Sequence, residues 1–148
     1  MLPPFAPSGL LPPGIHRPDD WSEIERRFGG SACRLQLLAG LGRVIAALRR
    51  AGCTALYLDG SFATSKSDPS DFDGCWDITG VDASLLDPVL LDFKNGRAAQ
   101  KAAFGGEVFP AHFQATPTGQ SYLDFFQTDK TTGNRKGIIQ LDPRSLTP

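Results

Sequence analysis

Two aspartates, Asp71 and Asp73, stand two residues apart in a segment that reads as an extended strand of about residues 71–78. Residues i and i+2 of a strand project from the same face, with Cα atoms ~6.5–7 Å apart, so both carboxylates can reach one hard cation. Magnesium takes one or two carboxylates and completes its shell with water and substrate phosphates. The pair therefore predicts a site for Mg²⁺, with Mn²⁺ as a substitute.

A Gly-Ser pair precedes these acids, where the apolar residues 55–58 end. Glycine lets the backbone approach a ligand closely, and a helical turn that begins at such a point offers N–H groups to phosphate oxygens. The Ser61 hydroxyl adds one more hydrogen bond. In the polar loop that follows, Lys66 could neutralise triphosphate charge, although a loop lysine is more often only solvated. Gly60, Ser61 and Lys66 thus predict a phosphate site beside the metal.

A third acid, Asp124, lies inside the apolar run 122–127, which reads as a strand. Burying an unpaired carboxylate there costs several kcal/mol or keeps it protonated, so we expect it to have a partner. A metal ion shared with Asp71 and Asp73 would be such a partner. Three carboxylates from two neighbouring strands could hold two metal ions about 3.5–4 Å apart, the arrangement that stabilises in-line displacement at phosphorus.

Paired aspartates also occur in three other kinds of segment: a solvated turn, a calcium-binding loop and a phosphatase motif. Taken alone, Asp-x-Asp is more often a solvated turn than a metal site, and 68–71 has good turn chemistry. A calcium-binding EF-hand loop would begin at Pro69 and close at Gly80, neither of which offers a side-chain oxygen. A phosphatase Asp-x-Asp-Gly motif would need an apolar strand directly before it, and 67–70 is polar. The EF-hand and phosphatase interpretations fail.

The elements that must position these residues follow from the periodicity of the chain. Asp19 and Asp20 offer N-cap chemistry for a short helix through about Arg27. Ser31 begins a longer helical pattern that ends at Gly52, with its apolar residues on one arc. A strand is expected at 54–59, and an interrupted helical region at 82–104. The last three expected strands are 107–113, 122–127 and 137–141. This order predicts an α/β or α+β fold, a mixed sheet with helices packed mainly on one face.

The first 18 residues hold six of the 12 prolines of the chain. Repeated proline fixes φ and removes hydrogen-bond donors, so 1–18 is expected to be an extended arm. Leu10, Leu11 and Ile15 are its candidate contacts with a single domain at 19–148.

Composition limits the classes of function. The chain has 148 residues and a formal net charge of −1, which gives no general nucleic-acid surface and no drive toward an acidic membrane. The start has no signal-peptide pattern, and no apolar run approaches the roughly 18–20 residues that span a bilayer. Three widely spaced cysteines without a Cys-x-x-Cys motif are typical of reduced thiols. We therefore expect a cytoplasmic protein.

The spacing Gly60-Ser61-x9-Asp71-Phe72-Asp73, with Asp124 on a later strand, resembles the signature of the DNA polymerase β-like nucleotidyltransferase superfamily. The chain is closest in size to the minimal nucleotidyltransferases of toxin–antitoxin and defence modules. The resemblance implies that Gly60 and Ser61 bind the β- and γ-phosphates. It also implies that Asp71 and Asp73 bridge two Mg²⁺ ions, and that Asp124 binds the ion that activates the attacking hydroxyl.

Nearly the whole chain also resembles a group of small uncharacterised bacterial proteins. The shared segments are Leu-Pro-Pro-Gly at 11–14, Leu-Asp-Gly-Ser-Phe at 58–62 and Asp-Phe-Phe-Gln at 124–127. This second resemblance brings no activity. One departure from the superfamily pattern is Gly74, directly after the paired acids, where glycine favours a bulge or bend.

Two hypotheses of function follow from the resemblance. The first is a Mg²⁺-dependent nucleotidyltransferase that moves a nucleoside monophosphate from a nucleoside triphosphate to a hydroxyl on protein, RNA or a small molecule, within a toxin–antitoxin or defence module. The alternative is a catalytically silent protein of the same fold, which binds a toxin or antitoxin partner.

Overall fold

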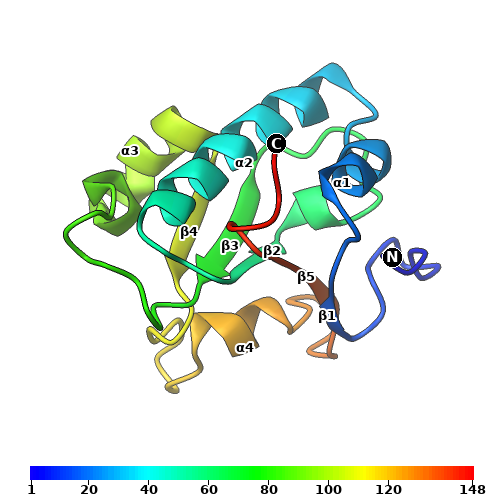
Figure 1. The fold of residues 1–148 in the computed structure, drawn as a ribbon. Helices are drawn as coiled ribbons and strands as arrows, with labels where there is room; N and C mark the ends of the chain where they lie inside the picture. Colours follow the sequence, from blue (N-terminus) through cyan, green and yellow to red (C-terminus); the bar gives the residue numbers. More distant parts are fainter.

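A five-stranded mixed sheet lies at the centre of the computed structural model, which describes residues 1–148 (Figure 1). In spatial order the strands are β1 (Gly14–His16), β5 (Gly137–Leu141), β2 (Leu56–Asp59), β3 (Phe72–Trp76) and β4 (Gly106–Pro110). Strand β2 pairs antiparallel with both β5 and β3, whereas β1 lies parallel to β5 and β4 lies parallel to β3. This mixed sheet confirms the expected α+β fold class.

Three helices cover one face of the sheet, and one short helix lies on the other (Figure 1). The three are α1 (Trp21–Phe28), α2 (Ala32–Arg50) and α3 (Lys94–Phe104), and the fourth is α4 (Tyr122–Phe126). Two short 3₁₀ turns, η1 (Ser61–Ala63) and η2 (Pro88–Leu91), complete the elements. The interrupted helical region expected before β4 corresponds to η2 and α3. No helix has the length and apolar character needed to cross a membrane.

The ends of α2 are fixed by the residues that predict them. The Ser31 hydroxyl accepts a hydrogen bond from the backbone N–H of Arg34, as an N-cap does. At the other end Gly52 has a φ of +83°, and its N–H donates to the carbonyl of Arg49. The N–H of Cys53 donates to the carbonyl of Leu48, which completes a Schellman motif. The expected helix and both of its boundaries are confirmed.

The main core lies between the sheet and the three covering helices and contains 25 buried hydrophobic residues. Helix α2 packs so closely on the end of α3 that a Cβ on Gly40 would lie 1.6 Å from the carbonyl oxygen of Phe104. A side chain at position 40 would therefore push the two helices apart. At Gly42, further along α2, a Cβ would meet only the Pro148 side chain, at 3.2 Å.

A second, smaller apolar cluster lies on the opposite face of the sheet, beside α4. It comprises Cys75, Phe109, Ala111, Phe126 and Ile138. Alternation along each strand separates the two faces, because successive side chains project to opposite sides. Residues 71, 73 and 75 therefore share the α4 face, while 72 and 76 belong to the main core.

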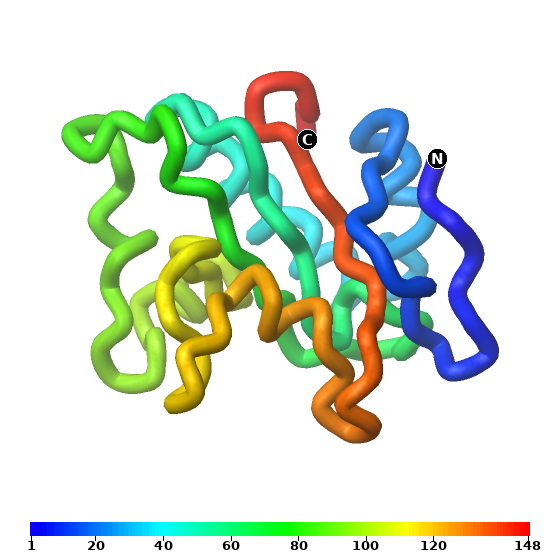
Figure 2. Tube along the Cα trace, turned by 90° about the horizontal axis from the view of Figure 1, so that it is seen from below, coloured from blue at the N-terminus to red at the C-terminus, as the bar shows by residue number.

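The proline-rich segment 1–18 packs on the domain and adds the edge strand β1, which runs parallel to β5. Figure 2 shows this blue segment beside the orange-red strand β5. Leu11 is buried, as expected, and so is Leu2. Ile15 was an expected contact, but its side chain is 43% exposed.

Two local predictions are wrong. Residues 122–127 were expected to form a strand, but they form α4, because Ser121 caps a helical turn by accepting a hydrogen bond from the N–H of Asp124. Gly74 makes no bulge and pairs in regular register with Leu58. A Cβ at position 74 would lie 2.7 Å from the carbonyl oxygen of Tyr57, so glycine there permits close approach of β2 and β3.

Candidate metal centre

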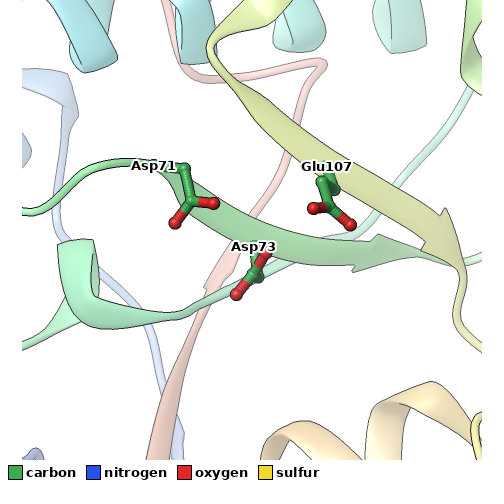
Figure 3. Close-up of side chains that lie close together, drawn as sticks. All are labelled: Asp71, Asp73 and Glu107. Atoms are coloured by element: carbon green, nitrogen blue, oxygen red, sulfur yellow. The ribbon is translucent and has the colours of Figure 1, made fainter. Parts of the chain in front are cut away.

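Three carboxylates converge on the α4 face of the sheet. Asp71, Asp73 and Glu107 each offer an oxygen atom, and these three atoms lie within 4.8 Å of one another (Figure 3). Asp71 directly precedes β3, Asp73 lies within it, and Glu107 lies on the neighbouring strand β4. Oxygen ligands at this separation suit a hard divalent cation.

Strand alternation and strand register create this cluster. Asp71 and Asp73 are two residues apart, so they project to the same side of β3, as the sequence predicts. Glu107 is the register partner of Asp73 in the parallel pairing of β3 with β4. On the other side of β3, Asp59 at the end of β2 is the register partner of the same Asp73. Four carboxylates therefore lie at the ends of three adjacent strands.

Burial and the close approach of other acids raise the pKa values of Asp71 and Asp73. Burial is the largest cause that raises the pKa of Asp73 to about 7, followed by the negative charges of Asp71, Glu107 and Asp59. Burial, and then the charge of Glu107, also raises the pKa of Asp71. Burial and neighbouring negative charges both disfavour the ionised carboxylates, and a bound cation would favour them.

Basic side chains already pair with two of the four acids. Glu107 is 11% exposed and accepts a bond of 2.8 Å from Arg97 Nε, and Lys101 Nζ lies 3.2 Å from its other oxygen. Asp59 is 6% exposed, and its Oδ1 lies 2.9 Å from Lys136 Nζ. Burial nevertheless raises the pKa of Asp59, and Lys136 opposes that effect. Asp71 and Asp73 have no such direct partner among the basic side chains.

The Arg97 contact depends on an unusual backbone. Asn95, Gly96 and Arg97 have φ values of 52°, 63° and 63°, which interrupt the first turn of α3 with left-handed residues. Non-glycine residues in this region cost about 1–2 kcal/mol each, and such strain tends to gather at functional sites. The kink brings the Arg97 guanidinium to Glu107 and within 5.8 Å of the Phe109 ring.

The Gly-Ser turn adjoins the acid cluster. Gly60 follows β2 with a φ of +84°, and a Cβ there would lie 3.0 Å from both the backbone nitrogen and Oδ2 of Asp73. Only glycine fits this position without displacing Asp73. Ser61 begins η1, and its carbonyl accepts a 2.6 Å hydrogen bond from the Thr64 hydroxyl. Lys66 lies in the loop beyond, exposed, and its charge is a minor effect that opposes the rise in the pKa of Asp71.

Asp124 does not join the cluster. It lies on α4, its side chain is 52% exposed, and its carboxylate pairs with Arg135 Nη1 at 2.8 Å. Gln120 donates a second bond of 2.7 Å, and these bonds from Gln120 and Arg135 lower the pKa of Asp124. Asp124 therefore has partners, as expected, but they are Arg135 and Gln120. The strand that would carry Asp124 to Asp71 and Asp73 does not exist.

Comparison with known proteins supplies a family but no activity. Residues 3–142 match the model of DUF6932, a family of unknown function. The chain belongs to this family. No curated protein and no solved structure matches the chain.

Two acids of the site in this DUF6932 chain, Glu107 and Asp59, were not predicted from the sequence. Glu107 carries the same signal that singled out Asp124, an acid embedded in an otherwise apolar strand, here between Gly106 and Val108. Asp59 directly precedes Gly60, at the point where an apolar strand ends. With Asp71 and Asp73, these residues form an arrangement that could bind one or two divalent cations and stabilise negative charge on phosphate oxygens.

Proposed function

We propose that the protein is a Mg²⁺-dependent nucleotidyltransferase, which transfers a nucleoside monophosphate from a nucleoside triphosphate to a hydroxyl group and releases pyrophosphate. One observation carries the proposal: three carboxylates gather within 4.8 Å of one another, and one of them, Asp73, lies directly against the Gly60 turn. The proposed reaction needs a metal-binding group and a phosphate-binding turn side by side.

The residues have distinct roles in this proposal. Asp71, Asp73 and Glu107 would hold two Mg²⁺ or Mn²⁺ ions, with Glu107 in the third position that the resemblance gives to Asp124. Such ions would supply positive charge to the transferred phosphoryl group and lower the pKa of the attacking hydroxyl. Gly60 and Ser61 hold the β- and γ-phosphates, with the Ser61 hydroxyl as a donor.

Metal binding would also change the partners of Glu107. Arg97 and Lys101 pair with it in this structure, and a divalent ion would replace them. The two side chains would then lie beside the metal-bound triphosphate, whose negative charge suits them. Lys66 would contribute from the loop after the Gly-Ser turn.

The acceptor is proposed to be a hydroxyl on protein, RNA or a small molecule, in a cytoplasmic toxin–antitoxin or defence module. The test is incubation of the protein with each labelled nucleoside triphosphate, Mg²⁺ and cell extract. Label should pass to an acceptor, disappear with Asp73→Asn or Glu107→Gln, and persist with Asp124→Asn. Absence of transfer with every nucleotide and extract would contradict the proposal. Loss of transfer in Asp124→Asn alone would restore the role that the resemblance gives to Asp124.

A second candidate is a catalytically silent binding protein of a toxin–antitoxin pair. It is favoured by the basic side chains that pair with Glu107 and Asp59 and so compensate two of the four acids. Titration calorimetry with Mg²⁺ and nucleotide separates the two candidates. Heat of binding for Mg²⁺-nucleotide favours the transferase. Its absence, together with a neighbouring gene product that co-purifies, favours the silent protein.

A further inference from the structure

A polar cavity lies apart from the acid cluster, between the end of α1, the start of α2 and the loop after η1. Its volume is about 330 Å³. Three cationic side chains line it, from Arg27, Arg34 and Lys66, together with hydroxyl-bearing residues at position 31 and in the loop 64–67. Asp68 is the one acid on its wall, so the lining carries two more positive than negative charges.

Arg34 brings a buried positive charge that forms no direct ion pair, although the negative charge of Asp68 acts on it. Only 5% of this residue is exposed. Its guanidinium donates five hydrogen bonds to the backbone carbonyls of Phe28, Phe62, Thr64 and Lys66, so it would act on a ligand through its charge and not through a free N–H group. Burial lowers its pKa, and the negative charge of Asp68 opposes that effect. An anion in the adjoining cavity would compensate this charge.

Arg27 adds a donor without an acceptor. Its Nη1 donates to the carbonyl of Leu2 at 3.2 Å, while its Nη2 is buried and has no hydrogen-bond partner. A buried donor left unpaired typically costs about 1–3 kcal/mol. The guanidinium lies 4.7 Å from the centre of the Phe5 ring, which also lines the cavity. A ligand there would meet a charged group beside an apolar surface.

The first turn of α2 forms another part of the wall through Gly30 and Ser31. This helix has 19 residues, and its positive end favours anions. In the first turn of α2, the backbone N–H of Arg34 donates a hydrogen bond to the Ser31 hydroxyl. The wall of the cavity therefore favours an anion. The features that attract it are the positive end of α2, the buried charge of Arg34, the unpaired Arg27 nitrogen and the exposed Lys66.

We infer that this cavity binds a phosphate dianion, either free or on a small organic ester. Its volume is near the lower end of the roughly 300–1,000 Å³ of small-molecule sites, which limits an ester to a small one. Arg34 also holds the carbonyls of the turn that follows Gly60 and Ser61, so the charge that would attract the phosphate is anchored to that turn. The site does not depend on the proposed transferase activity.

The test uses the full chain without divalent cations, in the presence of a chelator. Inorganic phosphate, adenosine 5′-monophosphate and adenosine are titrated while backbone amide shifts are followed by NMR. Both phosphates should shift the amides of Gly30 and Ser31, and adenosine should not. Tighter binding of the monophosphate would identify an ester as the ligand, and equal or weaker binding would identify free phosphate. Shifts confined to Gly60 and Asp73, or no shift at all, would overturn the inference.

Charge variants sharpen the test. Lys66→Gln changes an exposed loop residue, so the fold is kept, and phosphate affinity should fall about threefold. Asp68→Asn removes the opposing charge and should raise the affinity by a similar factor of about three. Arg27→Gln should lower it about tenfold or more. Unchanged affinity in both Lys66→Gln and Asp68→Asn would refute the site. Asp73→Asn should bind phosphate normally, which separates this result from any failure of nucleotide transfer.

Discussion

Replacing Asp73 by asparagine should stabilise the metal-free protein. The carboxylate lies among three other acids, and burial together with their charges raises its pKa from 3.8 to about 7. Asparagine has nearly the same shape as the protonated acid and carries no charge. The substitution therefore removes an unfavourable ionisation and leaves the packing of β3 intact.

The magnitude and its pH dependence follow from linkage between proton binding and folding. Between about pH 4 and pH 7 the unfolded chain has ionised this group while the folded chain still holds the proton, so the stability of the wild-type protein falls as pH rises. At about 1.4 kcal/mol for each pKa unit, the difference between 3.8 and about 7 amounts to about 4 kcal/mol above neutrality. The advantage of Asp73→Asn should be about 1.5 kcal/mol at pH 5 and about 4 kcal/mol at pH 8.

Urea unfolding, followed by tryptophan fluorescence in the presence of a chelator at both pH values, measures this difference. Asp77→Asn is the matched control, since Asp77 directly follows the same strand but hydrogen bonds from Thr79 lower its pKa. That variant should lose a little stability. The reasoning is refuted if Asp73→Asn is less stable than the wild-type protein at pH 8, or if its advantage does not grow between the two pH values.

Further predictions concern backbone approach and the counter-ion of Glu107. Gly60→Ala should lower the free energy of unfolding by about 1–2 kcal/mol, measured by urea titration, because it strains a left-handed φ and crowds Asp73. In the same assay Gly40→Ala should cost about 3 kcal/mol or more, whereas Gly42→Ala should be neutral or slightly stabilising. Arg97→Gln should tighten Mn²⁺ binding about threefold to tenfold, measured by calorimetry without nucleotide, since one competitor for Glu107 is removed.

Local signals in the sequence predicted most of the helices and strands. Ser31 and Gly52 fixed the ends of α2 through cap chemistry that acts within a few residues, and alternation fixed the face shared by Asp71 and Asp73. Strand β1 was not predicted, because its three residues have no periodicity of their own and become a strand only through pairing with β5. An arm rich in proline can contribute an edge strand without giving a local signal.

The third acid of the cluster could not be predicted from local sequence signals. Asp124 and Glu107 are both acids in apolar, aromatic segments, and nothing within either segment decides which one reaches Asp73. The choice depends on strand pairing, which places Glu107 opposite Asp73 on β4, and on the cap that turns 122–126 into a helix. Because pairing joins residues 34 positions apart, it cannot be read from either segment alone.

The loss of folding stability that the acid cluster causes is the strongest reason to regard the cluster as functional. Natural sequences usually agree with their fold at every level, and the exceptions concentrate at sites of function. Here four carboxylates crowd the ends of three adjacent strands, and ionisation of Asp73 alone destabilises the fold by about 4 kcal/mol above neutral pH. Nearby, Asn95 and Arg97 adopt left-handed backbone angles that bring a guanidinium to Glu107. Asparagine at position 71 or 73 would avoid this penalty, because neither acid pairs with a basic side chain. The proposed divalent cation, which needs the negative charges, would account for their presence.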